Sequence, residues 1–233
     1  MNEQLPCLGP ATVETPRYLL ETYWWAYVHP TAVRFFERQW LINSILWGNF
    51  DRLRDTALEG FGSDLRGRTL QIACVYGDLT EQLSRRISVG GDLDVVDVLQ
   101  VQLDNLKRKL PTHTRVKVRL GNSTSLHVES ASYDRALLFF LLHEQPAEVR
   151  RETLAEAVRV VKPGGKIVVL DYHRPHALHP LRWLMAPLLA RFEPYALDLW
   201  RHELTEWMPP RLWRSVCKNT YFGGLYQRMV IQL

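Results

Sequence analysis

The sequence is poor in cysteine, with Cys7, Cys74 and Cys217 as its only three. Three scattered thiols are too few for a disulfide framework or a zinc knuckle, and they fit a reducing compartment. The longest unbroken apolar run, 136–142, is far shorter than a membrane span. The first ten residues lack the basic and apolar regions of a signal peptide. These absences predict a cytoplasmic protein.

Long runs of one charge are also missing. The 29 Lys and Arg against 25 Asp and Glu give a formal charge of +4. Because the basic residues are not gathered into a patch, nucleic acid is not an expected partner. There is no internal repeat, low-complexity tract or heptad run. A length of 233 residues with 46% hydrophobic and 23% charged residues is typical of one α/β domain with additions.

The order of patterns along the chain predicts three parts. Residues 1–15 are expected to form a flexible tail and 16–66 a helical extension, since apolar residues recur there at three-to-four spacing. From 67 to 233, strand and helix patterns alternate, which favours a doubly wound, mainly parallel sheet covered on both faces. A helical insertion or lid is expected over 176–210, followed by a final strand pair or one long strand. The expected strands are 69–75, 94–98, 115–120, 133–142 and 166–172, and the expected helices are 79–87, 101–110 and 147–161.

Glycine is scarce where a cofactor loop is expected to be rich in it. The stretch LQIACVYGDLT (70–80) begins as a buried strand and ends as a helix start, yet it keeps only Gly77. A glycine there and the free N–H groups of the next helix would suit the anionic end of a ligand. Asp97 closes the second strand twenty residues later, where an acid binds ribose hydroxyls. The alternative is that Asp97 only solvates a strand end.

Five segments carry a family resemblance: LQIACVYGDLT, VVDVLQVQLDNLKRKL, GNSTSL, SYDRALLFFLLHE and EAVRVVKPGGKIVVLDYHRP. Over 69–175 the chain resembles class I S-adenosylmethionine (SAM) methyltransferases, nearest to the ubiquinone/menaquinone C-methyltransferases. The resemblance implies a Rossmann-like fold in which Asp97 holds the ribose of SAM. Asn122, where an acid is common, and Ser123 would lie beside the adenine. The other cofactor-binding positions it implies are Gln71, Ala73, Val75, Gly77, Val98 and Phe139.

The first loop departs from that family at three positions. Where an acid and two glycines are usual, this sequence has Gln71, Ala73 and Val75. Val75 is β-branched and poorly suited to positive φ, so a changed turn or a displaced methionine end of SAM is expected. A carboxylate near the SAM amino group favours ammonium, so its replacement by Gln71 makes the neutral, nucleophilic amine more accessible.

These changes, with the flanking segments TYWWAYVHPTAVRFFERQW and YFGGLYQRMV, resemble the RquA family of rhodoquinone biosynthesis over nearly the whole chain. The resemblance implies that ubiquinone is converted to rhodoquinone, with an amino group replacing a ring methoxy. SAM is the implied amino donor and manganese (Mn²⁺) the implied helper. The alternatives are a conventional SAM-dependent methyltransferase acting on a quinone or other lipid, and a non-enzymatic lipid-binding or scaffold protein.

Metal ligation and proton transfer remain open between several residues. Oxygen and imidazole ligands suit manganese, and the interpretation favoured is His143 with Asp171, joined by His173 or Glu144. His143 also matches a position where the quinone methyltransferases commonly have a histidine without metal. Asp78 or Tyr76 could serve as general base; Tyr76 alternatively packs against the adjacent helix.

Aromatic residues are concentrated at both ends of the chain and suit an isoprenoid quinone. Tyr23, Trp24, Trp25, Tyr27, Phe35, Phe36 and Trp40 precede the sheet, and Trp183, Met185, Leu188 and Trp200 follow it, beside Arg182, Arg191 and Arg201. They could line an apolar slot, lie at a bilayer surface or pack in the core. We expect peripheral association with the inner membrane, and the oligomeric state is left open.

Overall fold

The computed structural model describes residues 13–28, 30–111, 115–208 and 212–233, so most of the predicted tail lies outside the described residues. The helical extension contains α1 (Arg17–Thr22), a π-helical turn (Trp24–Val28), α2 (Pro30–Phe36), α3 (Gln39–Ile45) and α4 (Phe50–Glu59). The alternating part contains β1 (Arg68–Ile72), α5 (Leu79–Arg86), β2 (Asp92–Asp97), α6 (Gln100–Lys109), β3 (Val116–Leu120), β4 (Tyr133–Phe139), a 3₁₀ turn (Leu142–Glu144), α7 (Ala147–Val160) and β5 (Val161–Tyr172).

The C-terminal part begins with α8 (Arg182–Phe192) and α9 (Asp198–Arg201). Two 3₁₀ turns, Pro194–Leu197 and Leu204–Trp207, flank α9, so the later part of the helical insertion expected over 176–210 is broken into short pieces. The chain then forms an antiparallel hairpin of β6 (Ser215–Tyr221) and β7 (Tyr226–Gln232), which confirms the predicted final strand pair.

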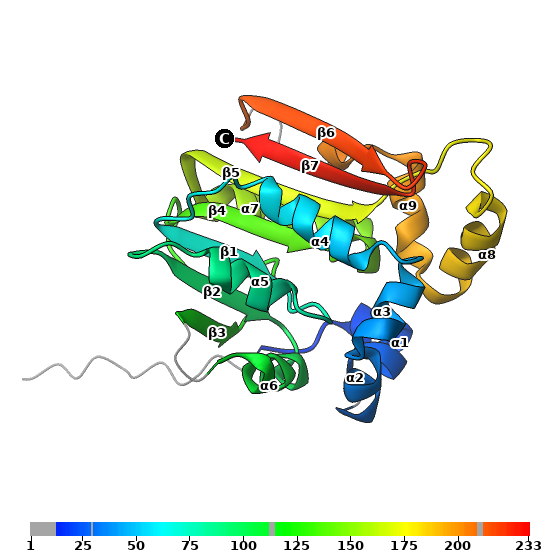
Figure 1. The fold of residues 1–233 in the computed structure, drawn as a ribbon, viewed down its shortest axis with the longest axis horizontal. Helices are drawn as coiled ribbons and strands as arrows, with labels where there is room; N and C mark the ends of the chain where they lie inside the picture. Colours follow the sequence, from blue (N-terminus) through cyan, green and yellow to red (C-terminus); the bar gives the residue numbers. More distant parts are fainter. Residues whose placement is uncertain (1–12, 29, 112–114, 209–211) are drawn as a thin grey trace, which may run out of the picture.

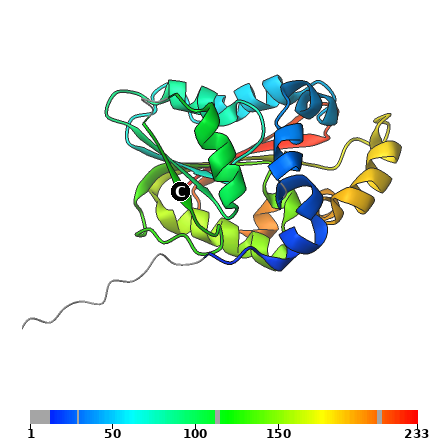
Figure 2. The same ribbon diagram turned by 90° about the horizontal axis from the view of Figure 1, so that it is seen from below.

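Seven strands form one sheet in the order β3-β2-β1-β4-β5-β7-β6, and β7 is antiparallel to both of its neighbours. The predicted α/β fold with a mainly parallel sheet is therefore confirmed. Figure 2 shows α4 and α5 on one face of the sheet and α7 on the other. The carboxyl ends of β1, β4 and β5 point toward the end of the molecule where α1, α2, α3 and α8 lie (Figure 1).

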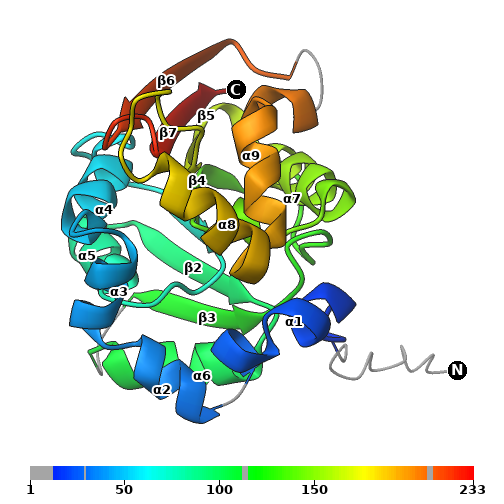
Figure 3. The ribbon, with the colours of Figure 1, turned by 90° about the vertical axis from the view of Figure 1, so that its right-hand side faces the viewer.

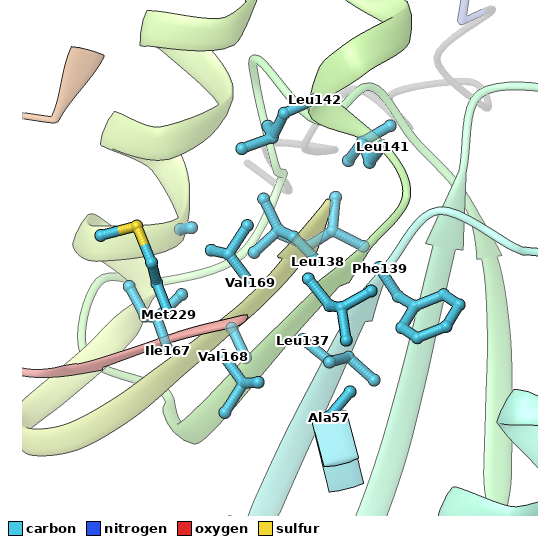
Figure 4. Packing of buried hydrophobic residues seen from close by; sticks show 14 of the residues in the cluster. Ala57, Leu137, Leu138, Phe139, Leu141, Leu142, Ile167, Val168, Val169 and Met229 are labelled. Atoms are coloured by element: carbon cyan, nitrogen blue, oxygen red, sulfur yellow. The ribbon is translucent and has the colours of Figure 1, made fainter. Parts of the chain in front are cut away.

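The core is built from the central strands, whose side chains alternate between the two faces. In Figure 4, Leu137 and Val168 lie on the same side as Ala57 of α4, whereas Leu138 and Val169 lie on the opposite side. All five side chains are buried. Both faces are covered, which is why β4 appears in the sequence as an unbroken apolar run.

β4 ends three residues earlier than predicted. Phe140 has a φ of 49°, in the left-handed region, and the chain then enters the 3₁₀ turn at Leu142. An apolar run cannot show this, because Phe140, Leu141 and Leu142 have the same composition as a strand. Because β4 ends early, His143 and Glu144 lie at the edge of the sheet where the other parallel strands also have their carboxyl ends.

Candidate active site

A cavity of about 590 Å³ lies at the carboxyl ends of β1, β2 and β4. This is the position where ligands bind in open α/β sheets. The N-terminal extension and the α8 region complete its walls, and the two touch each other. The rings of Trp25 and Phe192 lie 6.0 Å apart, and Trp47 Nε1 donates to Met185 Sδ at 3.3 Å. The lining is mostly apolar and aromatic, with a few polar groups, as in small-molecule sites generally.

The loop after β1 contains backbone strain at the cavity wall. Ala73 stands at one of the usual glycine positions and has a φ of 73°, a conformation that costs a residue with a Cβ about 1–2 kcal/mol. Val75 does not have a positive φ, so the turn is accommodated at Ala73 instead. Trp47 and Phe140 also line the cavity, and both have a positive φ. Strain of this kind concentrates at functional sites.

Gln71 is buried behind the loop and does not line the cavity. Its Nε2 donates to the Ala73 carbonyl at 3.0 Å, and its Oε1 accepts from Thr80 Oγ1 at 3.0 Å. An uncharged amide therefore ties the strained loop to α5. A carboxylate at this position could not donate to Ala73, so the loop is built around the amide.

Gly77 and Asp78 also lie outside the cavity lining, contrary to the sequence prediction. The Gly77 N–H donates to Glu37 Oε1 at 3.1 Å, and Lys109 Nζ donates to the Gly77 carbonyl. Burial alone would raise the pKa of Asp78, but hydrogen bonds from Gln82 and Arg54 lower it. Asp78 is thus a charged partner of Arg54 and does not reach the cavity as a base.

Asp97 lies at the cavity with both carboxylate oxygens oriented by the backbone. Oδ2 accepts from the Cys74 N–H at 2.7 Å and Oδ1 from the Leu99 N–H at 2.8 Å. Burial raises the pKa of Asp97 to about 6, against the lowering effect of these hydrogen bonds. Each oxygen retains a second lone pair for a ligand hydroxyl. Six further residues predicted to bind the cofactor also line the cavity: Ala73, Val75, Val98, Asn122, Ser123 and Phe139.

Tyr76 lines the cavity, but its hydroxyl is engaged by the protein. It donates to the Ala26 carbonyl at 2.6 Å and accepts from Gln102 Nε2 at 3.0 Å, while its ring stacks on Phe36. Burial raises the pKa of Tyr76 far above neutral pH. A bound, protonated phenol is not available as a general base, so this role is not supported. Tyr76 instead joins the loop to the N-terminal extension.

His143 is held rigidly at the cavity by Asp171. Asp171 Oδ1 lies 2.9 Å from His143 Nδ1, and Asp171 also accepts from the backbone N–H groups of Leu142, His143 and Tyr172. Burial lowers the pKa of His143, but the charge and hydrogen bond of Asp171 outweigh it and raise that pKa to about 9. The imidazole is therefore positively charged at neutral pH.

Two carboxylates lie near the other nitrogen of His143. Nε2 is 3.8 Å from Glu144 Oε1 and 3.9 Å from Glu193 Oε2. Burial raises the pKa of Glu193. Asp171 fixes the ring so that Nε2 faces this acidic corner of the cavity. The His143 imidazole and the two carboxylates can together transfer a proton to or from a bound molecule.

The predicted metal set of His143, Asp171 and His173 is not brought together. Asp171 is saturated by four N–H donors, and His173 places its Nδ1 2.8 Å from the Gly224 carbonyl, in a different cleft. Within the described ranges, no group of three or more His, Cys, Asp or Glu side chains could hold a metal ion. The residues therefore do not fit the implied manganese, and we derive no step through a metal.

Comparisons with known proteins agree with this geometry. Residues 69–165 match the family model described as a methyltransferase domain. The chain is 29% identical over 122 residues to a demethylmenaquinone methyltransferase of Staphylococcus aureus, a match covering 52% of this chain and 50% of the relative. The chain thus spans about half the length of the curated relatives it matches.

Solved structures identify the fold. Human N-acetylserotonin methyltransferase in complex with SAM gives a TM-score of 0.64 at 15% identity, covering 92% of this chain and 61% of that one. NodS, an N-methyltransferase from Bradyrhizobium japonicum in complex with S-adenosyl-L-homocysteine, gives 0.56 at 13% identity, covering 78% and 86%. The fold is that of the class I SAM methyltransferases, as predicted.

Several residues of the site were missed by sequence reasoning. Glu193 lies in an irregular segment after α8, so no periodic pattern marks it. Arg150 looks like a solvent-facing residue of α7 but is fully buried, and donates to the carbonyls of Leu142, Gln145 and Tyr195. It joins the turn that carries His143 to the 3₁₀ turn Pro194–Leu197. Its fully buried charge could not be found without the fold.

Proposed function

We propose that the protein is a SAM-dependent transferase acting on a quinone with an isoprenoid tail. The observation that carries the proposal is a single cavity with two kinds of wall. The Asp97 carboxylate and the polar groups of Asn122 and Ser123 suit a nucleoside, and the aromatic remainder suits an apolar ring. The similarity to a demethylmenaquinone methyltransferase supports a quinone as the second ligand.

Within this class, we propose that ubiquinone is converted to rhodoquinone, with the amino group of SAM replacing a ring methoxy. The altered loop supports amino transfer. Gln71 contributes an uncharged amide where a carboxylate would favour the ammonium form of the cofactor amine. A neutral amine has the lone pair needed to attack the quinone ring.

The chemistry needs a proton for the departing methoxy oxygen. The amine nitrogen bonds to the ring carbon and gives up a proton, and the methoxy group takes a proton and leaves as methanol. Water then hydrolyses the bond between that nitrogen and the donor's α-carbon, which frees the amino-quinone and leaves a hydroxyl group on that carbon. His143, whose pKa is raised to about 9 by Asp171 against the effect of burial, is charged at neutral pH and suits the role of general acid. Asp171 is the positioning residue that keeps Nε2 toward the cavity.

Peripheral association with the inner membrane is part of the proposal, because an isoprenoid tail keeps the substrate in the bilayer. In the part of the chain that the structure describes, no helix has the length and apolar character to cross a membrane.

The test is mass spectrometry of the quinone formed from SAM carrying ¹⁵N in its amino group. The purified protein, ubiquinone and SAM are incubated with and without manganese, which the family resemblance implies. An amino-quinone carrying the label is expected. A methylated quinone together with S-adenosylhomocysteine would instead establish the conventional methyltransferase.

Gln71→Glu separates the same two functions. It restores the acid usual in methyltransferases, which favours the ammonium form of the SAM amino group. If the pKa of that group rises by about one unit, or about 1.4 kcal/mol, the neutral amine becomes ten times rarer, so amino transfer is expected to fall at least tenfold. A conventional methyltransferase would lose no more activity than the change in SAM binding accounts for. Thermal unfolding of the variant checks that the loop still folds, and calorimetry checks that SAM still binds.

A further inference from the structure

Exposed apolar side chains are concentrated at one end of the molecule. Among the described residues, every large hydrophobic side chain that is exposed, apart from Val89, Leu120 and Leu212, falls within 20–47 or 178–192. The most exposed on these two segments are Leu178 at 96%, Trp183 at 80%, Trp40 at 59% and Trp24 at 58%. An apolar face of this kind marks an interaction surface.

The two segments form one continuous face around the mouth of the cavity. Figures 1 and 3 both place α1, α2 and α3 at the same end of the sheet as α8. The contacts of Trp25 with Phe192 and of Trp47 with Met185 join them. Trp47 and Phe192 are partly exposed and also line the cavity, so the face surrounds the entrance.

A second cleft, of about 440 Å³, opens beside this face at the start of α8. Three arginines line it, Arg174, Arg182 and Arg201. The two acids of its lining have other partners, since Glu203 pairs with Lys218 and Glu206 with His202.

The arginines of this cleft are not neutralised by close carboxylates of the described residues, so they can bind an anion. Among the described residues, no carboxylate pairs with Arg174 or Arg182, and Arg201 reaches Asp198 only at 3.8 Å. Guanidinium groups suit a phosphate. Arg182 is followed directly by the exposed Trp183, so the basic cleft and the apolar face meet at one end of α8.

We propose that this end of the molecule docks on an anionic phospholipid bilayer. The exposed Trp and Leu side chains enter the interfacial region, and the cleft of Arg174, Arg182 and Arg201 binds a lipid phosphate. The cavity entrance then opens onto the bilayer, and a lipid substrate enters without crossing water. The docking site gives a location to the membrane association of the proposed function, and the last consequence rests on the lipid substrate proposed there.

Charge distinguishes a bilayer from a second copy of the chain. The segment 174–192 contains three arginines and no Asp or Glu. Self-pairing about a two-fold axis brings the same patch of each copy together, so arginine would face arginine. Anionic headgroups supply the complementary charge.

The experiment is co-sedimentation of the full chain with vesicles of phosphatidylcholine alone and of phosphatidylcholine mixed with phosphatidylglycerol. Trp183→Ala removes an apolar contact, with Val89→Ala, which is 86% exposed and lies outside both segments, as its matched control. Arg174→Gln with Arg182→Gln removes charge from the cleft, with the exposed Arg66→Gln as its control.

The wild-type protein is expected to bind the mixed vesicles more tightly than pure phosphatidylcholine. Trp183→Ala is expected to weaken binding about tenfold on both vesicle types. The double variant Arg174→Gln with Arg182→Gln is expected to weaken binding about fivefold per charge, about twenty-fivefold in all, on the mixed vesicles only, and the controls are expected to leave binding unchanged.

Three results would overturn the proposal: no binding of the wild-type protein, equal losses in the controls, or a dimer in solution that does not bind vesicles. No substrate turnover is needed, so the outcome is separate from that of the labelled-SAM assay. Where a reaction is measured, the variants are expected to keep their rate on a tail-less quinone and to lose it on a quinone embedded in vesicles.

Discussion

Replacing His143 with glutamine should change how the stability of the protein depends on pH. Asp171 and the nearby carboxylates raise the folded-state pKa of this buried imidazole to about 9 from its ordinary 6.5, even though burial alone would lower it. The folded state therefore holds a proton that the unfolded chain has lost at pH 8. Stabilisation from this group is complete below pH 6.5 and disappears as the pH rises through 9.

The size of the effect follows from the shift. A pKa raised from 6.5 to about 9 corresponds to about 3 kcal/mol of unfolding free energy. Urea unfolding of the wild-type protein should show this loss between pH 6.5 and 9, in addition to whatever other groups contribute. His143→Gln has no proton to lose there, so the difference between the two proteins isolates the imidazole.

Equal differences in unfolding free energy at pH 6 and pH 9 would refute the reasoning. That result would mean that His143 is neutral in the folded state and cannot act as a general acid at neutral pH. Asp171→Asn provides an independent check, because it removes the main charge that raises the pKa. It should abolish the same pH dependence while leaving the histidine in place.

Three further changes test other parts of the site. Asp97→Ala should weaken SAM binding about tenfold to a hundredfold in calorimetry, since a hydrogen bond to a charged group contributes about 1.5–3 kcal/mol; Asp92→Ala, at the other end of β2, is the control and should bind normally. Gly77→Ala should destabilise the fold by about 2–4 kcal/mol in urea unfolding, because its φ is +83° and a Cβ would lie 2.6 Å from Phe50 Cζ; an unchanged midpoint would contradict the geometry. Arg150→Met should cost about 3–5 kcal/mol, measured in the same way, since it leaves three carbonyl acceptors without their donor, two of them buried.

The order of strands and helices could be predicted because each pattern is local. Buried strands such as β1 and β4 appear as apolar runs, and the helices between them show a period of 3.6 residues. The ends of elements were less certain. The last apolar residues of the β4 run leave the sheet at Phe140, where the backbone adopts a positive φ that composition does not encode.

The residues of the candidate site also fall into two groups, those whose positions follow from local rules and those whose positions depend on distant partners. Asp97 was predicted correctly to lie at the cavity, because the end of a parallel strand fixes both its position and its direction. Gly77 and Asp78 follow the same rule but lie outside the cavity, because Glu37 and Arg54 from the N-terminal extension engage them. Those partners are distant in sequence, and only packing reveals them.

The sequence alone determined the α/β class, the carboxyl-end edge of the sheet as the site, and the loss of glycine from the first loop. Each depends on neighbouring residues or on a rule of sheet topology. The tertiary structure alone decided that Ala73 takes the left-handed conformation, that Asp171 raises the pKa of His143, and that Glu193 lies near its Nε2. Burial and long-range charge set these properties, and neither exists until the chain has folded.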